Sequence, residues 1–479
     1  MLDIDIFVQE QENQQRIQIW RSGACAEDAK YVLYWMQRAQ RGRENHALNT
    51  AIALGSSLRL PVITAFVVTD YPQANLRHYT FMLEGLAVTA RQLKERGIPF
   101  VLRRGTPPDE IAGLAKELGA AAVVSDMCEL RVPRQWRNDL KEQLQIPFLC
   151  VDSDTIVPMA LIPHEEYAAR TIRPKIQRLL PTFLQPIVDI EIAHPLEKAP
   201  CDPGEVEQPL RYLESLKIDR SVPPSPDTRG GYEEGQKRVQ RLLTERLQAY
   251  NEQRNSPEQV GTSELSAYAH FGHISVQQLA WDVEQYRPEE TGSKHIDISG
   301  GKAAYLEELI VRRELAINFA YYNPRYDDLA GCPDWGLKTL KKHASDPREW
   351  VYSCQELEES RTHDELWNAC QGEMVTTGRM HGYMRMYWGK KILEWTETPQ
   401  EAFDTTIYLN DKYELDGRDA NGYASICWCI GGRHDRPWRE RPIFGLIRYM
   451  SADGMKRKID TQAYIYQHGN HPFKKQQVN

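Results

Sequence analysis

Three polar residues in the C-terminal half have types and surroundings that point to a binding pocket. Arg385 lies in a run whose apolar residues recur at helical spacing and predict one helix with a buried face, namely Met380, Met384, Tyr387, Trp388 and Trp395. A buried guanidinium needs a carboxylate partner, and Asp416 is a candidate. With the amide of Asn410, this pair would form a polar pocket in an aromatic wall. Such a pocket suits a flat redox cofactor, although a plain hydrophobic core would produce the same apolar stripe.

The length and composition set the frame for this pocket. The chain has 479 residues, which predicts two domains and a connector. Hydrophobic residues make up 41% and charged residues 26%, as in ordinary globular proteins. No apolar run approaches the roughly 20 residues that span a bilayer. The N-terminal residues 1–10 lack the features of a signal peptide. We therefore expect a cytosolic protein without a membrane partner.

The nine cysteines are an odd number with irregular spacing, which argues against a disulfide framework. Cys427 and Cys429 are too close in sequence for the usual metal knuckle, and no second pair or histidine pair completes a site. We interpret the cysteines as buried thiols and expect no metal.

The N-terminal part alternates short apolar runs with amphipathic segments. Continuous β-rich runs are typical of strands buried on both faces, and they occur at 31–36, 61–68, 99–102, 121–125 and 147–151. Helical segments such as 76–96 and 109–118 lie between them. Alternating strands and helices predict a Rossmann-like parallel sheet over residues 28–155. The Gly-x-Gly-x-x-Gly phosphate loop is absent, which argues against a dehydrogenase.

The rest of the chain divides into a connector and a helical domain. Residues 156–232 are rich in proline, so we expect a surface connector without long elements. A helix from Glu233 to about Tyr250 opens the second domain, and the helical pattern continues through residues 233–479. The predicted fold class is therefore α/β plus all-α.

Charge within the second domain suggests a nucleic-acid partner. The net charge of −8 alone argues against one, because phosphate affinity comes largely from Lys and Arg. Residues 433–458, however, carry eight basic against three acidic side chains. Trp428 and Trp438 are interleaved with this charge, and aromatic stacking beside phosphate contacts is how splayed-out nucleotides are held. A solvated basic face is the alternative explanation.

Two motifs in this domain carry a family resemblance. His381–Trp388 and Tyr413–Asp419 resemble the flavin-domain motifs of class II cyclobutane pyrimidine dimer (CPD) DNA photolyases. The resemblance implies a flavoenzyme that reopens dimers in DNA by light-driven electron transfer, a carbon-carbon lyase. It also implies a helical FAD-binding domain behind an N-terminal antenna domain, which can hold a second chromophore, a deazaflavin or a folate. A monomer is expected, located in the cytoplasm with the nucleoid or in the nucleus of a eukaryote.

By this resemblance, FAD is held by a Thr-Ser-x-Leu-Ser motif, an upstream tyrosine and the central polar residues. In this chain the cofactor-binding residues are Tyr250, Thr262, Ser263, Glu264, Leu265, Ser266, Arg385, Asn410 and Asp416. As a bare pattern, residues 262–266 also fit an ordinary helix cap, since Ser and Thr cap most helices.

The resemblance also assigns catalytic and DNA-binding roles. Asn410 would face the flavin N5, the Arg385–Asp416 pair would stabilise the reduced ring, and Glu308 would hydrogen-bond the dimer. The catalytic set is Glu308, Asn410, Arg385, Asp416 and Met386, and the DNA-binding set is Arg254, Glu308, Arg312, Trp428, Arg436, Trp438 and Arg448. Arg312 departs from relatives that carry tryptophan there. The role of His381 stays open at this point.

Three tryptophans match the class II electron-transfer chain, which reduces an oxidised flavin: Trp388, Trp367 and Trp395. Trp367 lies outside the predicted helix and would have to pack against it. The competing hypotheses are a cryptochrome-like photoreceptor and a non-catalytic DNA-binding protein with a vestigial pocket. Light-dependent loss of dimers from DNA would distinguish a repair enzyme from a photoreceptor. The yellow or blue colour of a bound flavin would exclude the non-catalytic DNA-binding protein.

Overall fold

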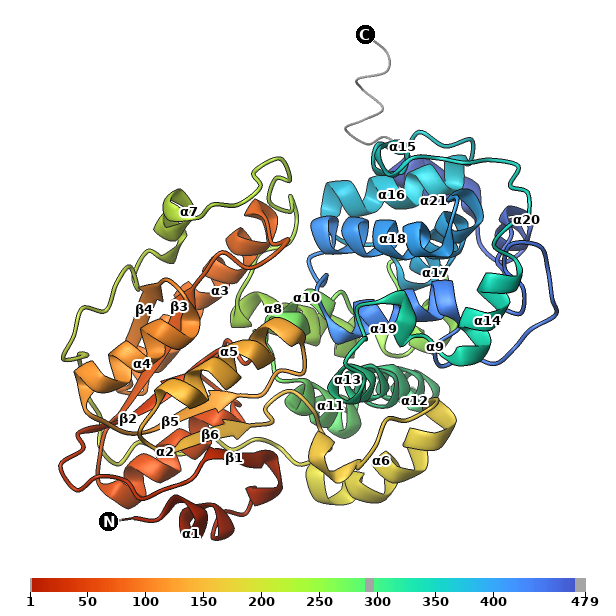
Figure 1. Ribbon diagram of the computed structural model, residues 1–479. Coiled ribbons are helices and arrows are strands. Elements are labelled where there is room, and N and C mark those ends of the chain that lie inside the picture. The colour runs from red at the N-terminus through yellow and green to blue at the C-terminus, as the bar shows by residue number, and fades with distance from the viewer. Residues whose placement is uncertain (1, 289–296, 470–479) are drawn as a thin grey trace.

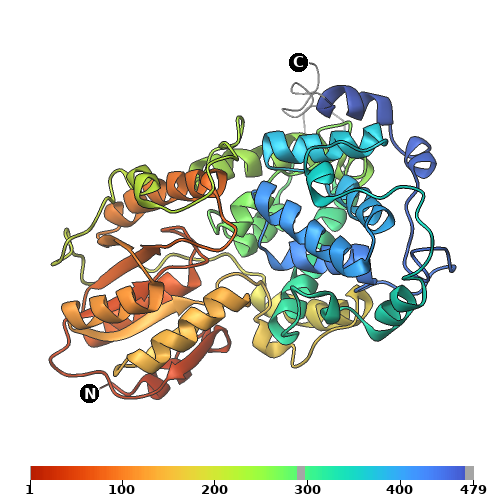
Figure 2. The ribbon, with the colours of Figure 1, turned by 45° about the horizontal axis from the view of Figure 1, so that its top comes forward.

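The computed structural model describes residues 2–288 and 297–469 and has two parts (Figure 1). A six-stranded sheet with its helices forms the N-terminal part, and a helical assembly forms the C-terminal part. Figure 2 shows the same two parts side by side from a second direction. The predicted fold class is confirmed. Within the described ranges, no helix has the length and apolar character needed to cross a membrane.

The sheet has the strand order β1-β6-β5-β2-β3-β4. Its strands are β1 (Ile17–Arg21), β2 (Tyr31–Trp35), β3 (Val62–Val68), β4 (Phe100–Arg104), β5 (Ala120–Asp126) and β6 (Phe148–Val151). All neighbouring pairs from β6 to β4 are parallel. Each of the five predicted strands is present, because β-branched residues buried on both faces give continuous apolar runs. The helices are α1 (Ile4–Gln9), α2 (His46–Leu58), α3 (Leu76–Glu95), α4 (Pro107–Leu118) and α5 (Arg131–Gln143).

Alternate residues of the strands face two separate hydrophobic clusters. Val32 and Tyr34 of β2 pack with residues of α2 and α3 on one face. Leu33 and Trp35 pack with residues of α4 and α5 on the other face. The sheet is therefore covered by helices on both sides.

Strand β1 is a strand of the sheet that the sequence did not predict. It pairs antiparallel with β6, with Ile17 opposite Val151, and forms the edge of the sheet. Only one of its five residues is buried, so it lacks the continuous apolar run that marks the inner strands. An antiparallel edge strand on a parallel sheet is common in large α/β proteins.

The prediction that the connector lacks long elements is wrong at one place. Helix α6 (Ala169–Phe183) runs for 15 residues and contains Pro174 and Pro181. Prolines usually end helices, but tertiary contacts stabilise this one. Ile172 and Ile176 are buried in the core of the helical part, and Arg173 forms an ion pair with Glu307. Otherwise the connector holds only the short elements η2 (Met159–Leu161), η3 (Pro209–Arg211) and α7 (Tyr212–Ser215) among the described residues.

The helical part follows the connector, and its first helix starts at Tyr232. Its α-helices are α8 (Tyr232–Arg241), α9 (Tyr250–Gln253), α10 (Ser266–His270), α11 (Val276–Gln285), α12 (Ser299–Leu306), α13 (Arg313–Tyr322), α14 (Asp334–Lys342), α15 (Cys354–Glu358), α16 (Glu365–Thr377), α17 (Gly382–Trp395), α18 (Pro399–Tyr413), α19 (Ala420–Gly431), α20 (Ala452–Lys456) and α21 (Thr461–His468). Two π-helical turns, η4 (Leu242–Arg246) and η5 (Glu307–Arg312), continue α8 and α12. The remaining short turns are η1 (Gln14–Arg16) and η6 (Leu329–Gly331).

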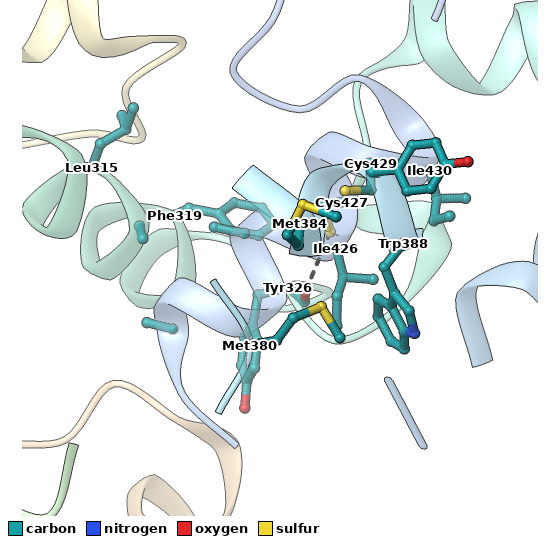
Figure 3. Packing of buried hydrophobic residues seen from close by; sticks show 14 of the residues in the cluster. Leu315, Phe319, Tyr326, Met380, Met384, Trp388, Ile426, Cys427, Cys429 and Ile430 are labelled. Atoms are coloured by element: carbon teal, nitrogen blue, oxygen red, sulfur yellow. Dashed lines mark hydrogen bonds between the residues drawn. The ribbon is translucent and has the colours of Figure 1, made fainter. Parts of the chain in front are cut away.

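Helices α13, α17 and α19 share the centre of the helical core. Figure 3 shows Phe319, Met384 and Cys427 from these helices lying together. Gly389 of α17 permits the close approach, because a Cβ there would lie 3.0 Å from the Cys429 sulfur. The predicted helix over residues 380–395 is confirmed from Gly382 onward, with its apolar stripe buried in this core.

Buried polar contacts join the two parts. Arg38, beyond β2, forms ion pairs with Asp154 and with Asp419 at the start of α19. Arg77 of α3 donates to the carbonyl oxygens of Met374 and Tyr413. These contacts fix the sheet against the helices that carry the candidate site.

Candidate functional site

The predicted pair of Arg385 and Asp416 is present. Arg385 Nη2 on α17 lies 2.9 Å from Asp416 Oδ1 and 2.8 Å from Glu414 Oε2, so the guanidinium has two carboxylate partners. Glu414 was not predicted from the sequence. Burial raises its pKa well above the ordinary value, although Arg385 opposes this shift. Burial also works against the charge on Arg385, but Asp416 and Glu414 outweigh it and raise the pKa of the guanidinium.

Asn410 lies on α18, in the segment that leads to Asp416. Its side chain is buried and donates from Nδ2 to Asp411 Oδ1 over 2.9 Å. A Cβ on Gly422 of α19 would lie 3.2 Å from this amide nitrogen, so α18 and α19 approach closely here. The structure therefore places Arg385, Asn410 and Asp416 on adjacent elements, with Met386 half-buried beside Arg385.

The predicted phosphate loop carries a cluster of arginines. Glu264 adopts a left-handed backbone conformation with φ of 56° and pairs with Arg238, Arg246 and Arg379. Arg246 also donates to the carbonyl oxygen of Thr262. Leu265 is buried, and Ser266 begins α10 as predicted. Thr262 and Ser263 are half-buried beside these residues.

The arginine cluster fits an anionic group such as the FAD diphosphate. Its three guanidinium groups face Glu264 and Asp227, which leaves one positive charge in excess. Nη1 of Arg379 is buried and lies 3.2 Å from Glu264 Oε1. A bound anion beside Thr262 and Ser263 would use this surplus charge. Residues from three separate segments form the cluster, so the sequence pattern did not reveal it.

Glu308 lies in the π-helical turn η5 and is held by two donors. It accepts from the Tyr250 hydroxyl over 2.5 Å and pairs with Arg254 over 2.7 Å. The three residues predicted to meet the flavin and the lesion therefore lie together. In this ion pair the carboxylate is an acceptor only. π-helical turns occur frequently at functional sites because they shift side chains out of the regular helical register.

The structure also places His381, whose role the sequence left open. Its Nδ1 accepts from the Tyr383 amide and caps α17 at its N-terminus. Burial lowers the pKa of His381 to about 4, and the charge of Arg385 adds to this effect. The imidazole is therefore neutral at pH 7.

The three predicted electron-transfer tryptophans lie in one row. The rings of Trp388 and Trp367 stack with centroids 6.4 Å apart and planes at 8°, and Trp395 follows Trp367 at 5.8 Å. Trp367 belongs to α16 and donates from its indole to the Trp388 carbonyl oxygen, so it packs against α17 as expected. All three rings are buried.

A second group of aromatic and basic residues lies in the last turn of α19 and in the segment that follows it. Arg448 lies 5.8 Å from the ring centroid of Trp428 and 4.7 Å from that of Trp438. Arg436 lies 5.5 Å from Trp438, which is 39% exposed. The structure brings these four predicted DNA-binding residues together. Arg312 instead lies exposed on η5 and pairs with Glu307, so nothing in its contacts reproduces a stacking wall.

A separate cavity opens where the carboxyl ends of β2, β3 and β5 meet the helical part. It encloses about 910 Å³ free of protein atoms, its open mouth included. Its lining combines aromatic rings with polar groups, among them Trp35, Gln37, Tyr71, Trp136, Phe271 and Arg418. Both amide atoms of Gln37 are buried without a hydrogen-bond partner among the described residues. Ligands of parallel sheets bind at this edge.

Known proteins share both the sequence and the fold of this chain. The DNA photolyase family model matches residues 32–197. The deoxyribodipyrimidine photo-lyase of Methanothermobacter thermautotrophicus is 43% identical over 438 residues, which cover 91% of this chain and 94% of that protein. The enzyme of the same name from Potorous tridactylus is 40% identical over 461 residues, 94% of this chain and 84% of its own length.

Solved structures agree on the fold. A bacterial class III photolyase from Agrobacterium tumefaciens superposes with a TM-score of 0.71 at 17% identity, covering 92% of this chain and 86% of that chain. An archaeal photolyase from Sulfolobus tokodaii, whose structure contains two FAD molecules, has a TM-score of 0.69 at 16% identity and covers 91% and 90% of the two chains. With identity of 40% or more to two photo-lyases over most of its length, this chain belongs to the DNA photolyase family.

Proposed function

We propose that this chain repairs cyclobutane pyrimidine dimers in DNA with the energy of light. The observation that carries the proposal is the arrangement of Arg385, Asn410 and Trp428 on three helices, α17, α18 and α19, that pack on one another. A pocket that suits a flavin would thereby lie next to an aromatic and basic surface that suits DNA. The identity with enzymes named deoxyribodipyrimidine photo-lyase supports the same activity.

FAD is the cofactor that the residues of the pocket fit. Its diphosphate would lie by Thr262, Ser263 and the arginine cluster, and its ring by Arg385 and Asn410. When bound and reduced, FAD supplies an electron to the dimer on illumination. Arg385 provides fixed positive charge at the ring, and Asp416 and Glu414 hold the guanidinium in place.

The protein's own task is to receive and hold the lesion. A flipped dimer would rest on Trp428, while Arg448, Arg436 and Trp438 would contact the distorted duplex. Extruding a damaged pair costs a few kcal/mol, less than for an intact pair, and this difference contributes to selectivity.

Glu308 would select the dimer by hydrogen bonding. Tyr250 and Arg254 orient its carboxylate in the free protein. The Tyr250 hydroxyl, at 2.5 Å, would keep the carboxyl group oriented.

The row of Trp388, Trp367 and Trp395 would carry electrons from the protein surface toward an oxidised flavin. Ring centroids spaced 5.8–6.4 Å apart leave no gap between the three rings. Its function would be to restore the reduced cofactor, and repair itself would not require it.

The cavity at the edge of the sheet would hold a second, light-harvesting chromophore. Its aromatic walls suit a flat heterocycle, and the free amide of Gln37 suits the polar edge of a deazaflavin or a folate. We further propose that the chain acts as a monomer, in the cytoplasm or in the nucleus of a eukaryote.

The test is repair of an oligonucleotide that carries one thymine dimer. Purified protein with reduced flavin should restore the two thymines under blue light and not in darkness. The Trp428→Ala variant should bind the damaged strand more weakly, whereas Arg21→Ala, a half-buried residue of the edge strand β1, should not. Intact dimers after illumination of the wild type would refute repair and favour a photoreceptor.

A further inference from the structure

A buried lysine lies directly behind Trp428. Lys390 of α17 has no exposed surface, and its ammonium donates to the carbonyl oxygens of Trp428 over 3.1 Å and Cys429 over 2.7 Å. The same nitrogen lies 4.3 Å from the centroid of the Trp428 ring. Among the described residues, no carboxylate oxygen lies within 4 Å of it. Lys390 is therefore a buried cation without an ion-pair partner.

The surroundings explain how the protein tolerates this charge. Trp428 and Cys429 belong to the last turn of α19, where free carbonyls and the helix dipole attract cations. The face of the indole adds a cation–π contact. A methionine would fill the same space without the cost of desolvating an ammonium. Lys390 thus caps the end of α19, and its charge lies directly behind the ring of Trp428.

We propose that Lys390 is a positioning residue for the dimer pocket. Its ammonium holds Trp428 in the orientation that receives the dimer, and it places a positive charge behind the indole, on the side away from the dimer. With the dimer in van der Waals contact on the opposite face, the charge lies about 8 Å from the pyrimidine rings. At this distance in a partly desolvated pocket, it attracts the negative charge that the dimer acquires.

This role rests on the proposed repair function and adds no chemical step to it. The electron comes from the reduced cofactor, the two bonds of the cyclobutane ring break, and the electron returns. Lys390 neither gains nor loses a proton in this sequence. It stabilises the dimer during the interval in which it carries the extra electron.

The neighbours of Lys390 allow a pH test. The titratable or charged groups that face its ammonium are Cys429, Cys332, Asp435 and Arg448. Burial lowers the pKa of Lys390 to about 8, and it raises the pKa of Cys429 to about 11. The positive charge is thus complete below pH 7 and is lost as the pH rises through about 8, while the Cys429 thiol keeps its proton.

The experiment compares Lys390→Met, Lys390→Arg and the matched control Lys391→Met. Lys391 is the next residue of α17, and it pairs with Glu394 and faces Tyr387. Two quantities are measured from pH 6.5 to 9.5: the dark affinity for damaged and undamaged strands, and the quantum yield of repair at saturating damaged strand.

We expect Lys390→Met to lose about fivefold or more in quantum yield at pH 7 and to weaken dark binding of the damaged strand selectively. The quantum yield of the wild type should fall as the pH rises through 8, whereas that of Lys390→Met should not change with pH. Lys390→Arg should restore the quantum yield, and its yield should not fall at high pH. Lys391→Met should match the wild type.

Several outcomes would overturn the inference. A quantum yield in Lys390→Met equal to that of the wild type would be one such outcome. Another would be an equal loss of affinity for damaged and undamaged strands, because a residue that only caps α19 would have that effect. If the wild type itself repaired no dimers, the proposed function would fail together with this inference. Repair by the wild type with no change in the Met variant would refute the inference alone.

Discussion

Replacing Arg385 with methionine is the substitution whose effect follows most directly from the structure. It leaves the side chain of Glu414, which is 1% exposed, and that of Asp416, which is 14% exposed, without their shared cation. Removing one partner of a buried ion pair costs about 3–5 kcal/mol, because the other charge stays buried. We expect a loss of this size in the free energy of unfolding at pH 8.

The loss should depend on pH. Burial already raises the pKa of Glu414 well above its ordinary value, and removing Arg385 raises it further. A carboxyl group with a raised folded-state pKa stabilises the protein fully below its unfolded pKa and loses this contribution as the pH rises. The variant should therefore approach the wild type near pH 5, where a proton replaces the missing guanidinium.

Urea unfolding at pH 5 and pH 8 measures both effects. The double variant Arg385→Met, Glu414→Gln should recover most of the loss at pH 8, because the buried charge is gone. Arg312→Met, an exposed control on η5, should stay near the wild type at both pH values. Bound FAD, read from the absorption spectrum, should fall in both variants that lack Arg385. Equal stability of wild type and Arg385→Met at pH 8 would refute the reasoning.

Three further predictions follow from other parts of the molecule. Trp367→Phe removes the middle ring of the row and should slow photoreduction of the oxidised flavin by about tenfold or more, measured by absorption spectroscopy. The variant should still repair dimers once its flavin is reduced chemically. Burial raises the pKa of Glu314 to about 8, so the wild type should lose melting temperature between pH 5 and pH 8.5 as this buried group ionises. Glu314→Gln cannot ionise there, and its melting temperature should fall less over the same range. A Cβ on Gly85 would lie 2.0 Å from His273 Nε2, so Gly85→Ala should lower the free energy of unfolding by about 1–3 kcal/mol. An unchanged midpoint of urea unfolding would contradict the packing between the two parts.

Much of the fold could be predicted because its elements have strong local patterns. The inner strands are buried on both faces, which imposes continuous β-branched runs, and the helix over 382–395 carries a clear apolar stripe. Strand β1 is an edge strand with one buried residue, and α6 contains two prolines. Their stability comes from tertiary contacts, which leave little trace in local sequence.

The candidate site shows the same division. Arg385 could be linked to Asp416 because a charge in an apolar stripe requires a partner, and the structure confirms that contact. Glu414, Lys390 and the arginines around Glu264 were not identified, since each acquires its partners from segments far apart in the chain. The π-helical turn that carries Glu308 also has no recognisable pattern in the sequence.

The most direct measurement is a crystal structure of the protein with FAD and a duplex that carries one thymine dimer. The account predicts the flavin ring beside Arg385 and Asn410, the diphosphate by Thr262 and the arginine cluster, and the dimer out of the duplex against Trp428. A dimer still stacked in the duplex, or a flavin bound away from Arg385, would contradict it.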